Sequence, residues 1–469
     1  MRKRCRPQMS NLSNVVLVVL FLLSCMSSPS AIAQKNELES ETSRYEVLQE
    51  IDSLLQANYV LPDKAVKYAE EFKKKYEGGH YNTYLNSKEF AEQVTADLIR
   101  ITNDKHIKFR VIEPSDVGEN PETPLHHPVR YHILGINENK GFSKLEWLEG
   151  NVGYVDIRRF YNFPDIKDRL IGAMKFLSNA SAIIVDLREN GGGSGDYLSS
   201  YFLEYPTQLS GSYSRQDDFV TEFWTLKDIG TERLTEVPLF LLTSKRTFSA
   251  SESFAYDMKV LKRATIIGES TKGGAHSVDL YKIGGQFEIY IPTARAINPT
   301  TGGNWEGTGV IPDIMVPSEA ALDTALVLAK EAGAKHAKTK EQKLRSAVEE
   351  MEIHMERAEQ LFRDNEIDEA RTALESVFQL ADENDLINEF FIDVLAYEYR
   401  SQSDEQILYA ILETKIELFP NSPTAHESMA YAYYKNARIE PAIGAFEKVL
   451  ELDPDNRNAM RMIERLRRE

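Results

Sequence analysis

The chain has 469 residues, and its 73 acidic and 55 basic side chains give a formal net charge of −18. A chain of this length exceeds what one hydrophobic core normally holds, so we expect two or three folded units. The excess of negative charge argues against nucleic acid or an anionic membrane surface as a partner, and we predict neither.

Residues 1–33 have the layout of a secretory signal peptide. Basic residues precede the apolar run Val15–Leu23, and small residues end the segment at Ala33. The alternative is a lipobox ending at Cys25, and only acylation there would attach the protein to a membrane. Both alternatives predict an exported protein, periplasmic or extracellular. Because both cysteines of the chain lie in this segment, cleavage after Ala33 would leave neither disulfides nor a Cys nucleophile.

The next segment, residues 34–128, is predicted to be an N-terminal helical domain. Apolar residues recur at helical spacing, as at Leu48, Ile51 and Leu55. A proline-rich stretch from Pro114 to Pro128 follows and should be irregular.

Residues 129–333 are predicted to form an α/β core. Short apolar runs alternate with helical patterns from Val152 onward, which indicates helices packed on a mostly parallel sheet. A polar, cationic segment at 334–345 is predicted to be a linker or an exposed helix start. Residues 346–469 fit a tetratricopeptide frame of three helical hairpins, with small residues at Ala358, Ala396 and Ala430. An ordinary helical bundle is the alternative.

The most informative stretch is Thr247-Phe-Ser-Ala-Ser-Glu-Ser-Phe254, which follows an apolar run at 238–243 and opens a helical pattern. This places Ser249 at a strand-to-helix turn, where the first N–H groups of the helix point at any bound group. A serine at a helix start is more often only an N-cap. Upstream, a buried-strand pattern at 182–188 runs into Glu189-Asn-Gly-Gly-Gly-Ser-Gly-Asp196. This loop lacks the frame of a nucleotide-binding motif, so the pair of features indicates an acyl-transfer site.

Six motifs between Tyr59 and Pro317 resemble, in the same order, the tail-specific (C-terminal processing) serine peptidases, in particular their tricorn-like and retinoid-binding-protein-like branch. They are Tyr59-Val-Leu-Pro-Asp63, Asp104-Lys-His-Ile107, Asp186-Leu-Arg-Glu-Asn-Gly-Gly-Gly193, Ser249-Ala-Ser-Glu252, the segment 267–276 and the segment 298–313. The resemblance implies a crotonase/ClpP-like βαβ peptidase core and a polypeptide substrate, with no cofactor and no metal. The stretch from Arg110 to Gly153 is too short for the family's PDZ domain, so the repeats are the candidate site for a protein partner.

By this resemblance Ser249 is the nucleophile, His106 the general base, and Glu306 the residue that holds or tunes the base. The oxyanion would be received by backbone N–H groups of Gly192, Gly193 and Ala250. The Ser–Lys members carry a lysine about 25 residues after the serine, a spacing implied by the resemblance; this chain has Gly274 there.

Two alternative bases remain open, Lys272 and His276. The branch also has a hydroxyl residue before its histidine and an Asp after its serine, where this chain has Lys105 and Ala250.

The sequence therefore predicts an exported serine peptidase that forms an acyl-enzyme on Ser249. One alternative is a non-catalytic ligand- or protein-binding member of the same fold. A crotonase-like acyl-CoA enzyme is a third interpretation, which suits an exported protein poorly.

Overall fold

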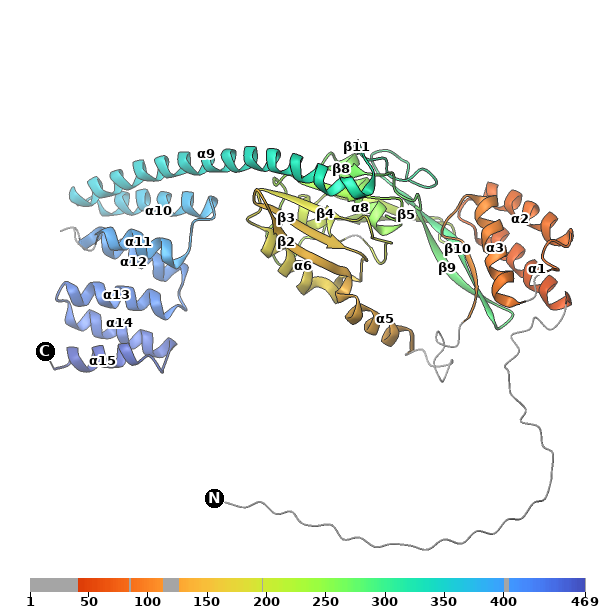
Figure 1. Cartoon of the computed structure of the whole chain (residues 1–469). Helices are drawn as coiled ribbons and strands as arrows, with labels where there is room; N and C mark the ends of the chain where they lie inside the picture. The colour runs from red at the N-terminus through yellow and green to blue at the C-terminus, as the bar shows by residue number, and fades with distance from the viewer. Residues whose placement is uncertain (1–40, 84–85, 113–125, 196, 400–404, 469) are drawn as a thin grey trace, which may run out of the picture. The chain divides into compact units, whose positions relative to one another are not determined.

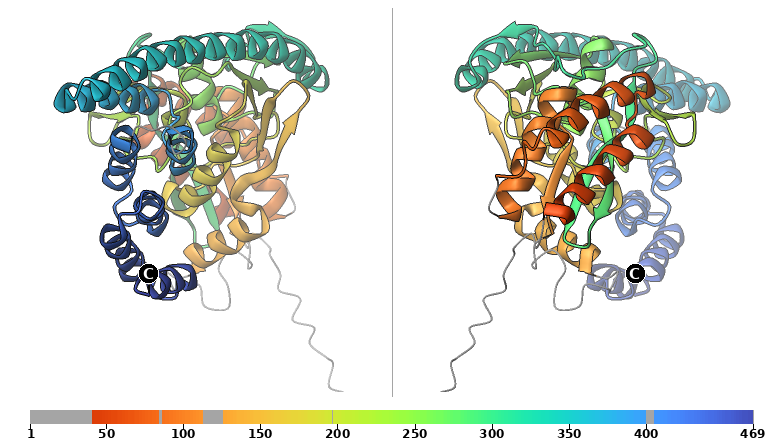
Figure 2. Two further views of the ribbon diagram at one scale, coloured as in Figure 1. Left: turned by 90° about the vertical axis from the view of Figure 1, so that its left-hand side faces the viewer. Right: turned by 90° about the vertical axis from the view of Figure 1, so that its right-hand side faces the viewer.

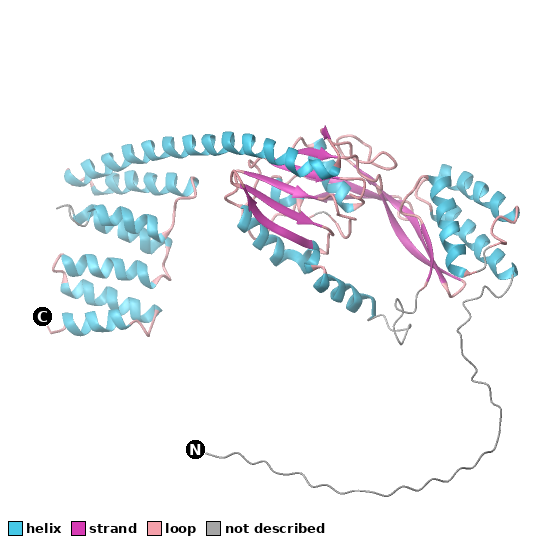
Figure 3. Cartoon of the chain, viewed as in Figure 1, coloured by secondary structure: helices cyan, strands magenta, loops and turns pink. Residues whose placement is uncertain are grey.

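The computed structural model describes residues 41–83, 86–112, 126–195, 197–399 and 405–468 (Figure 1). The predicted signal peptide, with Cys25 and Ala33, lies outside these ranges. Within them, no helix is both long enough and apolar enough to cross a membrane. Helical regions precede and follow a mixed α/β region along the chain (Figure 3).

The described chain divides into two compact units, the first of which takes residues 41–103, 107–112 and 279–291. Its elements are α1 (Glu41–Asn58), α2 (Pro62–Glu77), α3 (Ser87–Thr102), β1 (Lys108–Val111), most of β9 (His276–Ile283) and the first part of β10 (Phe287–Ile297). The predicted helical faces are buried, including Leu48, Ile51 and Leu55.

The predicted boundary of the helical domain at residue 128 differs from this division. Residues 279–291 join the first unit because β10 pairs antiparallel with β1 and its apolar side chains enter the helical core, as Phe287 and Ile289 do. Asp104–His106, by contrast, belong to the second unit. A contiguous prediction could not place a hairpin that returns from far along the chain.

The second unit is built on a six-stranded sheet in the order β11-β8-β7-β4-β3-β2. Its strands are β2 (Phe142–Leu148), β3 (Val152–Ile157), β4 (Ala182–Asp186), β7 (Leu239–Thr243), β8 (Ala264–Gly268) and β11 (Ile314–Met315). All neighbours pair in parallel except β2 and β3. Every residue of β3, β4 and β7 is buried, as expected for strands covered on both faces. The mixed α/β core is confirmed.

Helices cover both faces of this sheet (Figure 1). On β4, Ile183 and Val185 face the cluster that includes α6 (Phe163–Leu177) and α8 (Ala250–Val260), whereas Ile184 faces the start of α9 (Ala321–Arg363). This alternation is the two-residue period of a strand. Shorter helices lie at α5 (His126–Asn137) and α7 (Ser199–Phe202), with 3-10 turns at Asn139–Gly141 and Ser318–Ala320.

A hairpin of β5 (Gln208–Ser214) and β6 (Phe219–Trp224) lies beside α8. Strand β5 also pairs antiparallel with the last part of β10, which makes β6 the terminal strand of the order β1-β10-β5-β6.

Helix α9 runs through residues 334–345, so of the two predictions for this segment the linker is wrong and the exposed helix agrees with the structure. It is one helix of 43 residues that begins on the sheet and ends among the C-terminal helices (Figure 2). Residues 334–345 are rich in Lys, include two Ala and contain neither proline nor glycine, so nothing in them interrupts a helix. The remaining helices are α10 (Ile367–Glu383), α11 (Glu389–Tyr399), α12 (Glu405–Leu418), α13 (Pro423–Lys435), α14 (Ile439–Leu452) and α15 (Arg457–Leu466). The small residues predicted at Ala358, Ala396 and Ala430 are fully buried.

Candidate active site

Ser249 lies between the end of β7 and the start of α8, as the sequence predicts. Its backbone angles are φ 60° and ψ −123°, a region that residues with side chains rarely adopt. A serine on such a strained strand-to-helix turn presents its hydroxyl outward, as in the nucleophile turn of hydrolases. Ser249 is half-buried and lines a cavity.

The strained turn is held by Glu252, a residue to which the sequence analysis gave no role. One carboxylate oxygen accepts the N–H groups of Ser249 (2.8 Å) and Gly274 (2.9 Å), and the other accepts those of Gly273 (2.6 Å) and the Thr271 hydroxyl. Burial raises the pKa of Glu252, and these hydrogen bonds oppose that rise. The pattern Ser-x-x-Glu at a helix start is the signal that could have identified it.

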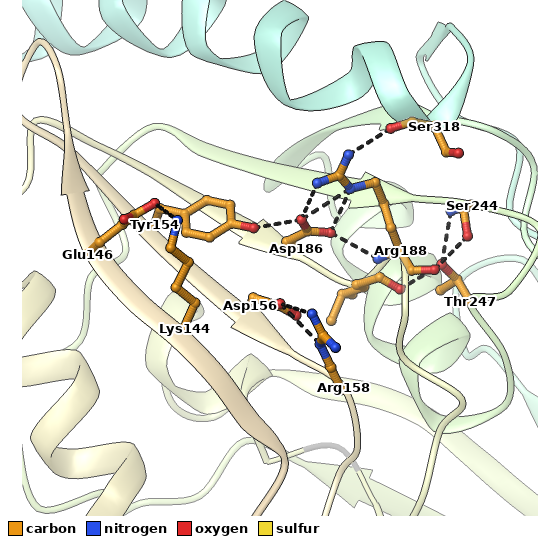
Figure 4. A network of polar contacts seen from close by, with 11 residues as sticks. Lys144, Glu146, Tyr154, Asp156, Arg158, Asp186, Arg188, Ser244, Thr247 and Ser318 are labelled. Carbon is orange, nitrogen blue, oxygen red and sulfur yellow. Dashed lines mark hydrogen bonds and ion pairs between the residues drawn. The ribbon is translucent and has the colours of Figure 1, made fainter. Parts of the chain in front are cut away.

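A second network fastens the end of β4 to the turn before Ser249 (Figure 4). The Asp186 carboxylate accepts hydrogen bonds from the Arg188 guanidinium (2.6 Å) and the Tyr154 hydroxyl (2.7 Å). Backbone carbonyls at the start of the following loop accept the hydroxyls of Ser244 (2.5 Å) and Thr247 (2.8 Å). The glycine loop and the serine turn are therefore positioned by one set of hydrogen bonds.

The glycine loop touches the serine turn at Gly192. A Cβ atom on Gly192, whose φ is 93°, would lie 2.7 Å from the Cβ of Ser249. The Gly192 N–H donates to the side-chain oxygen of Asn190 (2.8 Å), so this amide already has a partner and its predicted part in the oxyanion site is not favoured. The N–H groups of Gly193 and Ala250 make no hydrogen bond to any described residue, and both residues line the cavity with Ser249.

His106 lies against the residue that precedes Ser249. Its ring stacks on that of Phe248, with 4.3 Å between centroids, and its side chain is 11% exposed. Neither ring nitrogen has a hydrogen-bond partner among the described residues. Burial lowers the pKa of His106 to about 4, so the imidazole is neutral at pH 7.

The position that carries lysine in the Ser–Lys peptidases has no room for a side chain. A Cβ atom on Gly274 would lie 2.6 Å from Cε1 of His106 and 2.2 Å from the Phe248 ring. In this chain the two rings fill the space that the first atom of such a side chain would need.

The rival histidine, His276, is part of a buried carboxylate cluster. Its Nδ1 lies 2.5 Å from Oδ2 of Asp104 and 3.8 Å from Oε2 of Glu306. Glu306 accepts the N–H of Ala275 at 2.6 Å, while its other oxygen is buried without a partner among the described residues. Burial and then the charge of Asp104 raise the pKa of Glu306 to about 7. The pairing of Asp104 with His276 has no sequence signal, because 172 residues separate them.

Lys272, the other alternative base, is exposed, and its ammonium lies 4.5 Å from the centre of the Phe248 ring. A lysine acts as a base only when it is desolvated. The exposed position of Lys272 therefore does not favour it as the general base.

Ligand atoms of Asp104, His106 and Glu306 all lie within 4.8 Å of one another. Such a set could hold a divalent metal. The same closeness would let the carboxylates of Asp104 and Glu306 stabilise a protonated His106.

A cavity of about 460 Å³ opens beside Ser249. It is lined by the glycine loop, one face of α8 as far as Asp257, the β5–β6 hairpin and the segment 274–277. A strained serine, two amides without a partner among the described residues and a cavity on an α/β core define the class of site found in serine hydrolases.

Residues 151–316 match the family model described as Peptidase family S41, and residues 36–144 match the N-terminal domain of Peptidase_S41 in eukaryotic IRBP. The two segments together take up more than half of the chain, which therefore belongs to peptidase family S41, a family of serine-type peptidases.

Two curated relatives show how similar this sequence is to known peptidases. A carboxyl-terminal-processing protease of Picosynechococcus is 27% identical over 207 residues, which cover 43% of this chain and 48% of the relative. A tail-specific protease of Haemophilus influenzae is 32% identical over 191 residues, covering 38% of this chain and 25% of the relative. The matches thus span about half or less of the length of these relatives.

Among solved structures, the photosystem II D1 C-terminal processing protease is 17% identical, with a TM-score of 0.38. The match covers 59% of this chain and 94% of that structure.

Proposed function

We propose that this chain is an exported serine peptidase that hydrolyses peptide bonds through an acyl-enzyme on Ser249. The observation that carries the proposal is the strained turn of Ser249. It opens onto one cavity together with Gly193 and Ala250, whose amides have no partner among the described residues.

In the proposed reaction, Oγ of Ser249 attacks the carbonyl carbon of the substrate and transfers its proton to an imidazole. The N–H groups of Gly193 and Ala250 donate to the resulting oxyanion, and one such donor contributes about 3 kcal/mol in other enzymes. The C–N bond then breaks as the imidazolium protonates the leaving amine. A water molecule attacks the acyl ester, the imidazole accepts its proton, and the serine hydroxyl is restored as the carboxylic acid leaves.

We assign the general base to His106. Three features support this choice: the ring stacks beside the serine turn, it is neutral at pH 7, and its nitrogens have no partner among the described residues. Glu306 and Asp104 would stabilise its charged form. Among the described residues no hydrogen bond joins the Ser249 hydroxyl to either imidazole, and in peptidases such bonds often tighten only when substrate binds. His276, already bound to Asp104, is the alternative base.

The finer assignments belong to the same proposal. Export rests on the signal-like composition of residues 1–33. A tetratricopeptide role for residues 346–469 rests on the packing of helices that follow one another along the chain, such as α13 on α14, and these hairpins would recruit a protein partner. The crotonase/ClpP-like description rests on the parallel sheet and the oxyanion site.

The proposal is tested by hydrolysis of an unstructured polypeptide such as casein. Ser249→Ala should abolish cleavage, whereas Ser253→Ala, one turn further along the same cavity wall, should retain it. Cleavage that survives Ser249→Ala would show that the nucleophile lies elsewhere. A wild-type protein that binds polypeptide without cleaving it would support the non-catalytic alternative.

A further inference from the structure

The cavity beside Ser249 has a charge pattern that the proposed chemistry does not use. Its described lining includes the acidic residues Glu222 and Asp257 but neither lysine nor arginine. It also includes four large aromatic side chains: Tyr197, Phe223, Trp224 and Trp305. A cavity with acidic groups and aromatic walls is complementary to a cation that has an apolar stem.

Asp257 lies at a distance from Ser249 that suits a long side chain. Ser249, Ser253 and Asp257 follow one another at four-residue intervals along α8, so all three lie on the helix face that lines the cavity. Eight residues of helix correspond to a rise of about 12 Å. A substrate residue whose carbonyl lies at Ser249 would therefore need an extended side chain to reach Asp257.

The Asp257 carboxylate is fixed by neutral donors and has no cationic partner within ion-pair distance among the described residues. Residue Asp257 is 1% exposed, and its oxygens accept hydrogen bonds from the N–H and hydroxyl of Ser210 and from Asn298 (3.0 Å). Burial raises the pKa of Asp257, and these hydrogen bonds oppose that rise. A buried carboxylate without a counter-ion is costly, and an entering cation would remove that cost.

We propose that this cavity takes a lysine or arginine side chain of the polypeptide substrate, with its cation paired to Asp257 and its stem against the aromatic walls. The inference rests on the proposed peptidase function. The bound residue is the one whose carbonyl Ser249 attacks, because the serine and the unbonded amide of Gly193 line the same cavity. Glu222, exposed on β6, would attract the cation as it enters.

The test compares two peptides that differ only at that residue, one with arginine and one with citrulline, its neutral isostere. The full-length protein should cleave the arginine peptide with a kcat/KM about tenfold to a hundredfold higher, the range expected for a charge-assisted bond. Asp257→Asn should remove this preference by slowing cleavage of the arginine peptide much more than cleavage of the citrulline peptide. Glu222→Gln, on the exposed wall, should reduce the preference only slightly. Equal rates for the two peptides with the wild-type protein would overturn the proposal.

A binding measurement keeps the result independent of turnover and of the folding of Asp257→Asn. We expect p-aminobenzamidine, a fluorescent amidinium, to bind the full-length wild type and Ser249→Ala equally, and to be displaced by arginine amide but not by citrulline amide. Displacement by both amides, or no binding, would also contradict the proposal. Labelling of Ser249 by a fluorophosphonate would separate this failure from a failure of the peptidase assignment, because labelling does not need the cation site.

Discussion

Replacing Glu306 with glutamine should stabilise the protein at alkaline pH while slowing catalysis. The Glu306 side chain is 18% exposed, and its pKa is raised by burial from 4.5 to about 7. The fold therefore disfavours the ionised carboxylate. Glutamine has the same shape and can still accept the N–H of Ala275, but it carries no charge.

The magnitude follows from the raised pKa. In the unfolded chain the carboxyl ionises near 4.5, whereas in the fold it stays protonated until the pH approaches 7. Ionising Glu306 in the fold therefore lowers the free energy of unfolding. This loss is absent below pH 4.5, grows between pH 4.5 and 7, and is constant above pH 7, where it reaches about 3 kcal/mol at most. The stabilisation by Glu306→Gln should likewise be absent below pH 4.5, grow between pH 4.5 and 7, and stay constant above pH 7.

Thermal unfolding at pH 4.5 and at pH 8 measures this difference. For a domain of this size, about 1 kcal/mol corresponds to 2–4 °C in Tm, so the variant should melt several degrees higher at pH 8 and close to wild type at pH 4.5. The exposed Glu331→Gln on α9 is the matched control and should change neither value. If Glu306→Gln lowered the Tm at pH 8, the ionised carboxylate would be stabilising and the reasoning would be refuted.

Three further predictions concern the site and the helical region. Gly274→Ala should lower turnover about a hundredfold, because its Cβ displaces the His106 ring. The control Gly172→Ala, which has nothing within 4 Å of the new atom, should leave turnover unchanged. Equal turnover of the two variants would contradict this prediction. His106→Ala should lose orders of magnitude in kcat and His276→Ala less, and the reverse order would move the base to His276. Removal of residues from 340 onward should leave a soluble core that cleaves short peptides, because the sheet-facing part of α9 ends before that point. A truncated core that folds but is inactive would show that the repeats complete the active site.

The core strands were predictable because their sequences are compatible with few secondary structures other than a buried strand. Apolar runs such as 182–187 are bounded by glycine or polar residues and are too short for a buried helix. For residues 334–345 the sequence left a linker and an exposed helix start open, because a polar segment without apolar period can be either. The long α9 is fixed by packing at its two ends, which local pattern does not reveal.

Some residues of the site could be placed from the sequence, and others could not. Ser249 could be placed from a local strand-to-helix pattern, and Glu252 could have been, because both depend on spacing within one turn. The pairing of Asp104 with His276, and the Gly192 amide already bonded within its own loop, depend on tertiary geometry that no spacing encodes.

The central claim is that Ser249 is an activated nucleophile, and covalent labelling tests it most directly. Full-length protein treated with a fluorophosphonate should gain the mass of one adduct, and peptide mapping should place that adduct on Ser249. Ser249→Ala should gain none. An adduct on another residue, or an unlabelled wild-type protein that is folded, would contradict the account.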